Sequence, residues 1–339
     1  MKNQFNIIKS ALPKTTNVPS VQNILLSGGT LTATDLEMLI TVPIESDLNA
    51  LLPPKTVEIV NAVDAVDLEL HEQTLHIKSG RGKFKLSCDT GIDDYPAPWH
   101  ITDLTEVHAE NFISALRSVL FAVSKEETRP AFMCVLMECK DKHLQLMASD
   151  TYRLAIAGTK AEADDFRVLV PPKVLRELSR LNPSKLELGF TDSAVTFKAD
   201  DVLLSSRLLN ENYPDVSSVI PKESKTTVTA TQEGLSEPLA EMVKRASLIA
   251  EGKNKAIELS VVDGTLTVKA QGLDGTMEES LKVRHTGEDV TLYVNADYFG
   301  DVLKYQGLEI KLHGEQGAVV VERPGYDYLY LLLPVKKVN

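Results

Sequence analysis

Two aspartates stand at matching places in similar strings and are the first candidates for acid–base chemistry. Asp35 lies in GGTLTATDLEM and Asp150 in KHLQLMASDTYRL, 115 residues apart. Paired carboxylates can act as general acid and base. An Asp repeated at the same point of two strand–turn–strand strings more often fixes the turn by accepting backbone N–H bonds, and we expect this structural role for both.

Other catalytic and metal-binding signatures are missing from the sequence. The seven histidines stand singly, without H-E-x-x-H spacing, and there is no G-x-S-x-G or Walker-type G-x-x-x-x-G-K-[ST] string. Cys88, Cys134 and Cys139 form no C-x-x-C pair, which favours neither a zinc site nor a disulfide framework and fits a reducing compartment. The sequence therefore predicts no catalytic residue, no metal and no cofactor.

Basic side chains recur on the polar faces of predicted helices. They are Lys9 and Lys14 near the N-terminus, Arg117 and Lys125 at 108–124, Lys173, Arg176 and Arg180 at 171–181, and Lys244 and Arg245 at 236–250. Such faces can simply be solvated, or they can contact phosphates of a duplex without reading its sequence. Only 6% of the residues are aromatic, which argues against stacking platforms for single strands.

Composition limits the class of protein. The chain has 339 residues, 43% of them apolar, and a formal net charge of −12. It is too long for one typical domain and too acidic to coat nucleic acid or an anionic membrane with its whole surface. The N-terminal segment has no apolar core of a signal peptide, and no window matches a membrane helix, so we expect a cytoplasmic protein without a membrane partner.

The chain repeats itself with a period near 115 residues. DGTLTVKA (263–270) gives a third copy of the strand–turn string, and DDYPAPWHI (93–101) is echoed by NENYPDVSSVI (210–220). Because three echoes agree on one period, we predict three domains, at 1–103, 104–222 and 223–339, with boundaries after the two Tyr-Pro segments.

Each copy is predicted to be an α+β unit, with two helices laid on antiparallel sheet. Period-2 alternation marks strands at 31–44, 75–88, 144–158, 194–209, 266–270, 290–294 and 318–335. Period-3.6 stripes mark helices at 108–124, 171–181, 236–250 and 295–307, besides a short first helix that ends by Pro13. Pro172 suits a first helical turn, and Asn295 suits an N-cap.

Several strings together resemble the bacterial DNA polymerase III β subunit family, the sliding clamps, in order and spacing over nearly the whole chain. They are SGGTLTATDLEM, HIKSGRGKFKLS, ASDTYRLA, RLLNENYPDVSSVIP and YLYLLLPVKK. The resemblance implies a homodimeric ring of three DNA-clamp domains per subunit that encircles duplex DNA, tethers the polymerase and catalyses nothing. The implied partners are duplex DNA, the DNA polymerase III catalytic subunit, the clamp loader and other proteins with a clamp-binding motif.

The resemblance also implies a pocket for partner peptides between the second and third domains and the C-terminal tail. Matched position by position, it consists of Phe132 on a strand, Ser149, Thr151, Tyr152, Arg153, Leu154, Pro214, Val219, Leu331, Leu332, Leu333, Pro334 and Val335. For DNA it adds Arg81 and Lys83, in SGRGKF, and Lys14 to the helix faces. The apolar tail residues are equally compatible with a terminal core strand.

Two departures from the family keep alternatives open. Thr151 and Tyr152 stand where the family commonly has Gly and His, which predicts a bulkier pocket rim. The first domain begins late, and we expect it to lack an edge strand. A paralogue or mobile-element copy with altered partner specificity is the main alternative, and an unrelated enzyme of repeated α+β domains is the other.

Overall fold

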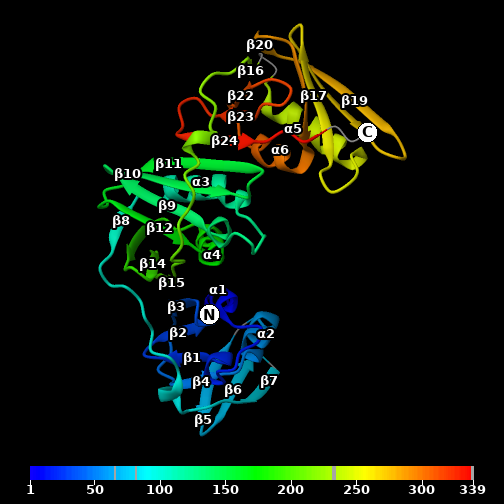
Figure 1. Ribbon diagram of the computed structural model, residues 1–339. Helices are drawn as coiled ribbons and strands as arrows, with labels where there is room; N and C mark the ends of the chain where they lie inside the picture. Colours follow the sequence, from blue (N-terminus) through cyan, green and yellow to red (C-terminus); the bar gives the residue numbers. More distant parts are fainter. Residues whose placement is uncertain (65, 81, 231–233, 337–339) are drawn as a thin grey trace. The chain divides into compact units, whose positions relative to one another are not determined.

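The computed structural model describes residues 1–64, 66–80, 82–230 and 234–336, which fall into two compact units (Figure 1). The first unit combines residues 1–113 with 161–210, and the second combines 114–160 with 211–339. Each unit therefore joins one terminal repeat of the sequence to part of the middle repeat. All the strand pairs described below are antiparallel, as the alternating patterns predict.

The first unit is built on one long sheet in the order β4-β1-β2-β3-β15-β14-β13-β8. Strands from the two repeats meet where β3 pairs with β15, for example Ile40 with Leu204. The strands are β1 (Ile24–Ser27), β2 (Thr30–Thr34), β3 (Met38–Pro43), β4 (Ala50–Leu52), β8 (Thr105–Val107), β13 (Leu186–Phe190), β14 (Ala194–Ala199) and β15 (Val202–Arg207). A single sheet thus continues from one repeat into the next.

Helices and a smaller sheet complete this unit. The helical segments are α1 (Lys2–Ile8), η1 (Lys9–Ala11), η2 (Ser20–Gln22), α2 (Lys55–Ala62), η3 (Ile92–Asp94) and α4 (Pro172–Leu181). The smaller sheet is β5 (Asp67–His71), β6 (Thr74–Ser79) and β7 (Gly82–Ser87), while β12 (Phe166–Val170) leads into α4. The first helix and its 3-10 extension end before Pro13, as predicted. Helix α2 is the second helix of the first copy, for which the sequence predicted no limits.

Helix α4 matches its predicted limits because its signals are local. Pro172 opens its first turn, and Asn182 takes a left-handed conformation (φ 49°) just after its end. Val174, Leu175 and Leu178 are fully buried, so the stripe faces the sheet. The basic residues are left on the opposite side.

The segment that connects the first two repeats crosses the β3–β15 seam and is fastened to it. His100 Nδ1 lies 2.6 Å from Ser205 Oγ on β15, and His100 Nε2 lies 2.8 Å from Thr41 Oγ1 on β3. The Ile101 N–H donates to Thr196 Oγ1 at 2.9 Å, and Thr196 and Ser205 are themselves hydrogen-bonded. The imidazole thus bridges both strands through buried or half-buried hydroxyls.

The second unit has two sheets. In one, the strands β9, β10, β11, β24, β23, β22, β16 and β20 run side by side in that order, and the other has the order β19-β18-β17-β21. Their limits are β9 (Val135–Lys140), β10 (His143–Ser149), β11 (Arg153–Lys160), β16 (Thr226–Thr229), β17 (Ala256–Val262), β18 (Thr265–Gln271), β19 (Thr276–Lys282), β20 (Arg284–Gly287), β21 (Val290–Asn295), β22 (Glu309–Leu312), β23 (Val319–Glu322) and β24 (Tyr328–Leu332). The pairing of β11 with β24 joins the middle repeat to the last one.

Helices α5 (Ser236–Ile249) and α6 (Ala296–Leu303) belong to the second unit, together with the 3-10 turns η4 (Leu120–Ala122), η5 (Pro130–Met133) and η6 (Ser217–Val219). Asn295 caps α6 as predicted, because its side chain accepts the Tyr298 N–H at 3.0 Å. Helix α3 (Ala109–Val119) runs from the first unit into the second. None of the helices in the described ranges combines the length and apolar character that crossing a membrane requires.

Two predicted helices end earlier than their stripes. The helix predicted at 108–124 stops at Val119, and the one predicted at 295–307 stops at Leu303. After η4 the chain turns extended at Val123, and the Ser124 N–H donates to the Phe132 carbonyl at 2.9 Å. This contact with a later segment replaces the last helical hydrogen bonds.

The turns that contain Asp35 and Asp150 are built in the same way. Asp35 Oδ1 accepts the N–H groups of Glu37 and Met38 at 3.1 and 2.8 Å. Asp150 Oδ1 accepts those of Tyr152 and Arg153, both at 3.0 Å. The residue after each aspartate, Leu36 or Thr151, has φ 76°. The predicted structural role of both aspartates is confirmed. The two similar strings form turns with the same pattern of hydrogen bonds.

Candidate functional site

The hairpin from Ser149 to Leu154 and the C-terminal tail lie side by side in the second unit. Arg153 pairs with Leu332, and Leu154 pairs with Leu331, along β11 and β24. Beyond β24, the Leu333 N–H donates to the Tyr152 carbonyl at 2.9 Å. The Val335 N–H donates to the Tyr293 carbonyl at 2.8 Å. The structure therefore brings together two segments that the sequence separates by almost 180 residues.

The Arg153 guanidinium is the centre of this region and is buried, with 8% of the residue exposed. Its Nε donates to Asp150 Oδ2 at 2.9 Å, Nη1 to Asp301 Oδ2 at 2.5 Å and Nη2 to the Phe121 carbonyl at 2.9 Å. Its Cζ lies 4.0 Å from the centroid of the Tyr298 ring. These contacts fix the hairpin to η4 and α6.

Burial and neighbouring charges shift the pKa values of Arg153 and Lys304 in this cluster. Burial alone would lower the pKa of Arg153, but Tyr330 and the carboxylates of Asp301 and Asp150 raise it above its ordinary value. Burial lowers the pKa of Lys304, whose ammonium lies 4.7 Å from the Phe121 centroid. Arg153 is thus a permanently charged, buried side chain that stabilises the hairpin and is not free to contact a ligand.

The residues predicted to bind a partner peptide differ in how much of each side chain is exposed. Tyr152, Val219 and Leu333 are 54%, 56% and 41% exposed. Ser149, Leu154, Leu331 and Leu332 are buried, while Pro214 is exposed and Thr151, Pro334 and Val335 are half-buried. Tyr152, Val219 and Leu333 are therefore accessible to a ligand, whereas the buried members of the set are not.

Phe132 differs from its prediction. It lies in the 3-10 turn η5 before β9 and not on a strand, because Pro130 opens a turn there. Its ring packs edge-on against Tyr213, with centroids 5.2 Å apart. Tyr213 precedes Pro214, so Phe132 is tied to the second Tyr-Pro segment.

Sequence reasoning missed the partners of Arg153. Asp301 lies 148 positions further along the chain, and Phe121 contributes a backbone carbonyl as well as a ring. Tyr298 and Asp301 stand three residues apart on α6, the spacing of neighbours on one helix face, but no local pattern links them to Arg153.

The predicted cationic residues that are described all lie on the surface. Lys9, Lys14, Lys83, Arg117, Lys125, Lys173, Arg176, Arg180, Lys244 and Arg245 are exposed. Lys14 and Lys125 do not belong to helices, because η1 ends at Ala11 and η4 at Ala122, so that part of the prediction is wrong. Lys83 lies on β7, and Arg81 falls outside the described residues.

Several of these cations hold a carboxylate. Lys173 is paired with Asp35, Arg180 Nη2 lies 2.7 Å from Glu177 Oε2, and Arg245 is paired with Glu279 and Glu241. The helix faces are therefore less strongly basic than their sequence pattern indicates. Across the described ranges, no group of three or more His, Cys, Asp or Glu side chains is arranged to hold a metal ion.

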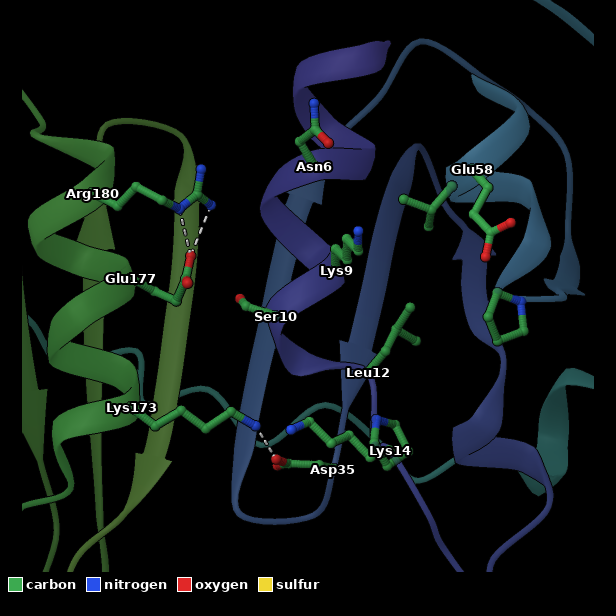
Figure 2. Close-up of a pocket in the computed structure, with 13 residues that line it drawn as sticks. Asn6, Lys9, Ser10, Leu12, Lys14, Asp35, Glu58, Lys173, Glu177 and Arg180 are labelled. Carbon is green, nitrogen blue, oxygen red and sulfur yellow. Dashed lines mark hydrogen bonds and ion pairs between the residues drawn. The ribbon is translucent and has the colours of Figure 1, made fainter. Parts of the chain in front are cut away.

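A pocket of about 720 Å³ opens in the first unit between α1, α2 and α4 (Figure 2). Its charged lining residues are Lys9, Lys14, Lys173, Arg180, Asp35, Glu58 and Glu177, and its apolar ones are Leu12, Pro13, Pro54 and Val57. Figure 2 shows the ammonium groups of Lys14 and Lys173 both directed toward Asp35. Cations from two repeats thus meet in one cavity.

Comparisons with known proteins agree on one family. Residues 106–215 match the model of the DNA polymerase III beta subunit, central domain, and residues 217–336 match that of its C-terminal domain. The chain is 31% identical over 292 residues to the beta sliding clamp of Bacillus subtilis, covering 80% of this chain and 75% of that protein. It is 28% identical over 372 residues to the beta sliding clamp of Halalkalibacterium halodurans, covering 98% and 96%.

The fold is also that of solved structures. The crystal structure of the DNA polymerase sliding clamp from Bacillus subtilis superposes with a TM-score of 0.89 at 26% identity, over 99% of this chain and 97% of that one. The DNA polymerase III beta subunit of Thermotoga maritima superposes with a TM-score of 0.87 at 23% identity. Neither the mobile-element alternative nor the enzyme alternative is favoured by these similarities.

Proposed function

This chain belongs to the DNA polymerase III beta subunit family, the beta sliding clamps, and from that premise we propose that two copies close into a ring around duplex DNA. The ring tethers the polymerase III catalytic subunit and other clamp-binding partners, and a clamp loader places it on DNA. Its contribution is topological and not catalytic. A cytoplasmic location, where bacterial DNA is copied, belongs to the same proposal.

The observation that carries the proposal is where the cations stand in an acidic chain. The net charge is −12, yet exposed lysines and arginines recur on helices of all three repeats, such as Lys9, Arg176 and Lys244. Contacts of this kind with phosphates are individually weak and independent of base sequence. A ring with such a lining slides along the duplex and is retained by closure, so it needs no tight binding.

Topological retention can be tested directly. The protein is loaded by its clamp loader onto nicked circular DNA, separated from free protein, and the DNA is then cut once with a restriction enzyme. A ring should leave the linear DNA by sliding off its ends, while it stays on the uncut circle. Equal retention on both forms would mean that the protein is held by direct binding, and the proposal would be wrong.

Ring closure is supported by two open sheet edges. In the described chain, β7 has β6 as its single neighbour, and β19 has β18. Exposed strand edges are templates for pairing with another chain. The charged residues of β7 are Lys83 and Lys85, whereas β19 carries Glu278, Glu279 and Lys282, so the net charges of the two strands are opposite. We propose that β7 of one copy pairs with β19 of the other.

An exposed leucine near the third-repeat edge offers the test of closure. Leu248 is 80% exposed and lies on α5, the helix that packs against β18 and β19. Leu248→Glu should shift the mass measured by light scattering from twice 37.3 kDa toward 37.3 kDa. Val262→Glu, at a 44% exposed valine on β17, is the control and should leave the dimer intact. A dimeric Leu248→Glu variant would exclude this edge.

The partner peptide is proposed to bind over Tyr152, Val219 and Leu333, the exposed apolar members of the predicted set. Apolar anchors in a pocket with a few orienting polar groups are the usual basis of peptide affinity. We also propose domain limits at 1–103, 104–222 and 223–339. They are supported by the strands β8 and β16, which open the second and third repeats at Thr105 and Thr226.

A further inference from the structure

We propose that the pocket between α1, α2 and α4 is a phosphate-binding site for the DNA backbone whose affinity is held down by two built-in carboxylates, Asp35 and Glu177. The inference rests on the proposed function, which places duplex DNA against the helices. It adds a defined site and a reason why that site binds weakly. The occupant is a phosphodiester group of the duplex.

Charge complementarity points to an anionic occupant. Four cationic side chains line the pocket, Lys9, Lys14, Lys173 and Arg180, against three carboxylates. The surplus is positive in a chain whose net charge is −12. Within the part of the chain that the structure describes, Lys9 and Lys14 form no ion pair, so their ammonium groups are available to a ligand.

The other two cations are occupied from within. Lys173 on α4 is paired with Asp35, and Arg180 donates through Nε and Nη2 to Glu177 Oε2, at 2.9 and 2.7 Å. A carboxylate presents to a cation the same kind of oxygen acceptors that a phosphate does. Asp35 and Glu177 therefore occupy the contacts that a phosphate would make.

Asp35 cannot withdraw when DNA arrives. Its Oδ1 is fixed by the N–H groups of Glu37 and Met38, so Oδ2 stays at the pocket wall facing Lys173. A phosphate must compete with a carboxylate that is already in place. Each contact then gains little net free energy, which is the condition under which a ring can slide.

The equivalent turn of the second repeat shows the contrast. Asp150 also fixes its turn, but the cation that it holds, Arg153, is buried and bound to Asp301 and Phe121 as well. That arginine cannot be released to a ligand. Only in the first repeat does the turn aspartate, among the described residues, face an exposed lysine and an open cavity.

The test removes the carboxylates and measures binding of the full chain to a fluorescein-labelled linear duplex by anisotropy, over a range of chloride concentrations. Asp35→Asn keeps an oxygen for the turn and loses the charge, and Glu177→Gln does the same on α4. Each should tighten binding about threefold or more at low salt and steepen the plot of log K against log salt by about 0.9, since one cation is freed for a phosphate. Lys9→Ala with Lys14→Ala should weaken binding and flatten the slope.

Controls keep the result specific. Glu187→Gln removes a carboxylate paired with Lys198 at 2.7 Å on the sheet, so it makes the same change of net charge outside the pocket and should leave the slope unchanged. If Asp35→Asn alters folding, Glu177→Gln carries the test, because its side chain lies on a helix surface. Unchanged affinity and slope in both pocket variants would overturn the inference.

Two further outcomes separate the sources of phosphate and the two proposals. Calorimetric titration of Asp35→Asn with inorganic phosphate should give no saturable heat, because a single free ion lacks the neighbouring phosphates of a duplex. Tight binding of the free ion without tighter DNA binding would also overturn the inference. A wild-type protein that stays on linearised DNA refutes the ring. Pocket variants that bind DNA like the wild type, in a protein that does slide off, refute the pocket alone.

Discussion

His100 is expected to make the stability of the first unit depend on pH below neutrality. The imidazole lies between Ser205 and Thr41, at 2.6 and 2.8 Å, and bridges the two strands that join the first and second repeats. Its burial lowers its pKa from the ordinary 6.5 to about 4. The folded protein thus holds the ring neutral at pH values where the unfolded chain already binds a proton.

The size of the effect follows from these two pKa values. Between pH 6.5 and about 4 the unfolded state binds more protons than the folded state, so the free energy of unfolding falls as the pH falls through this window. The stabilisation is complete above pH 6.5. By about pH 5 it should have decreased by about 2 kcal/mol, and the full difference between the pKa values corresponds to about 3 kcal/mol.

The assay uses a reporter that the chain provides. Trp99, the only tryptophan, precedes His100, so its fluorescence follows unfolding of this segment in urea. His100→Asn retains a hydrogen-bonding side chain that cannot be protonated. The stability difference between the wild type and this variant should shrink by about 2 kcal/mol from about pH 7.5 to about pH 5.

His143→Gln is the control for losing one imidazole, since His143 lies half-exposed on β10 in the other unit. It should not remove the pH dependence of the Trp99 transition. A wild-type-minus-His100→Asn difference that stays constant over this pH range would refute the idea that burial of His100 keeps it neutral.

Other substitutions test the remaining contacts. Leu333→Ala should weaken binding of a clamp-motif peptide by about 1 to 3 kcal/mol in a fluorescence titration, and equal peptide affinity of the wild type and this variant would exclude the pocket. Leu332→Ala, at a residue 1% exposed, should instead lower the free energy of unfolding by about 2 to 5 kcal/mol. Arg176→Glu should flatten the salt dependence of DNA binding, and an unaltered slope would mean that this face does not meet DNA. Asn295→Ala should cost about 1 kcal/mol by removing the α6 cap, seen as a lower urea midpoint. Thr151→Gly should raise stability by up to about 1 kcal/mol because Thr151 has φ 76°, and a fall would show that the threonine side chain compensates for its strained backbone.

Features set by neighbours in the chain were predictable. Pro172 and the stripe of α4 mark that helix, Asn295 caps the next residues, and Asp35 bonds N–H groups two and three residues ahead. Each depends on contacts within one turn, so residue types and spacing suffice to predict them. The period near 115 follows from the same local signals, repeated.

Features set by distant segments were not predictable. After α3 and η4, the Ser124 N–H donates to the Phe132 carbonyl, eight residues further along the chain, and not back into the helix. Arg153 donates to Asp301, 148 positions away in the sequence, and Lys173 donates to Asp35, 138 positions away. No periodicity encodes such pairs, because they arise only when sheets from two repeats pair edge to edge.

The sequence by itself determined the repeat, the antiparallel strands, the limits of α4 and α5 and the family, since these rest on local propensity and on the order of motifs. The tertiary structure alone decided which charges are available. It turned Arg153 from a pocket residue into a buried support, and it set Asp35 and Glu177 against cations that the sequence shows as a basic face. The physical reason is that the effect of a charge depends on the charges and burial around it, and those are fixed only when distant segments pack.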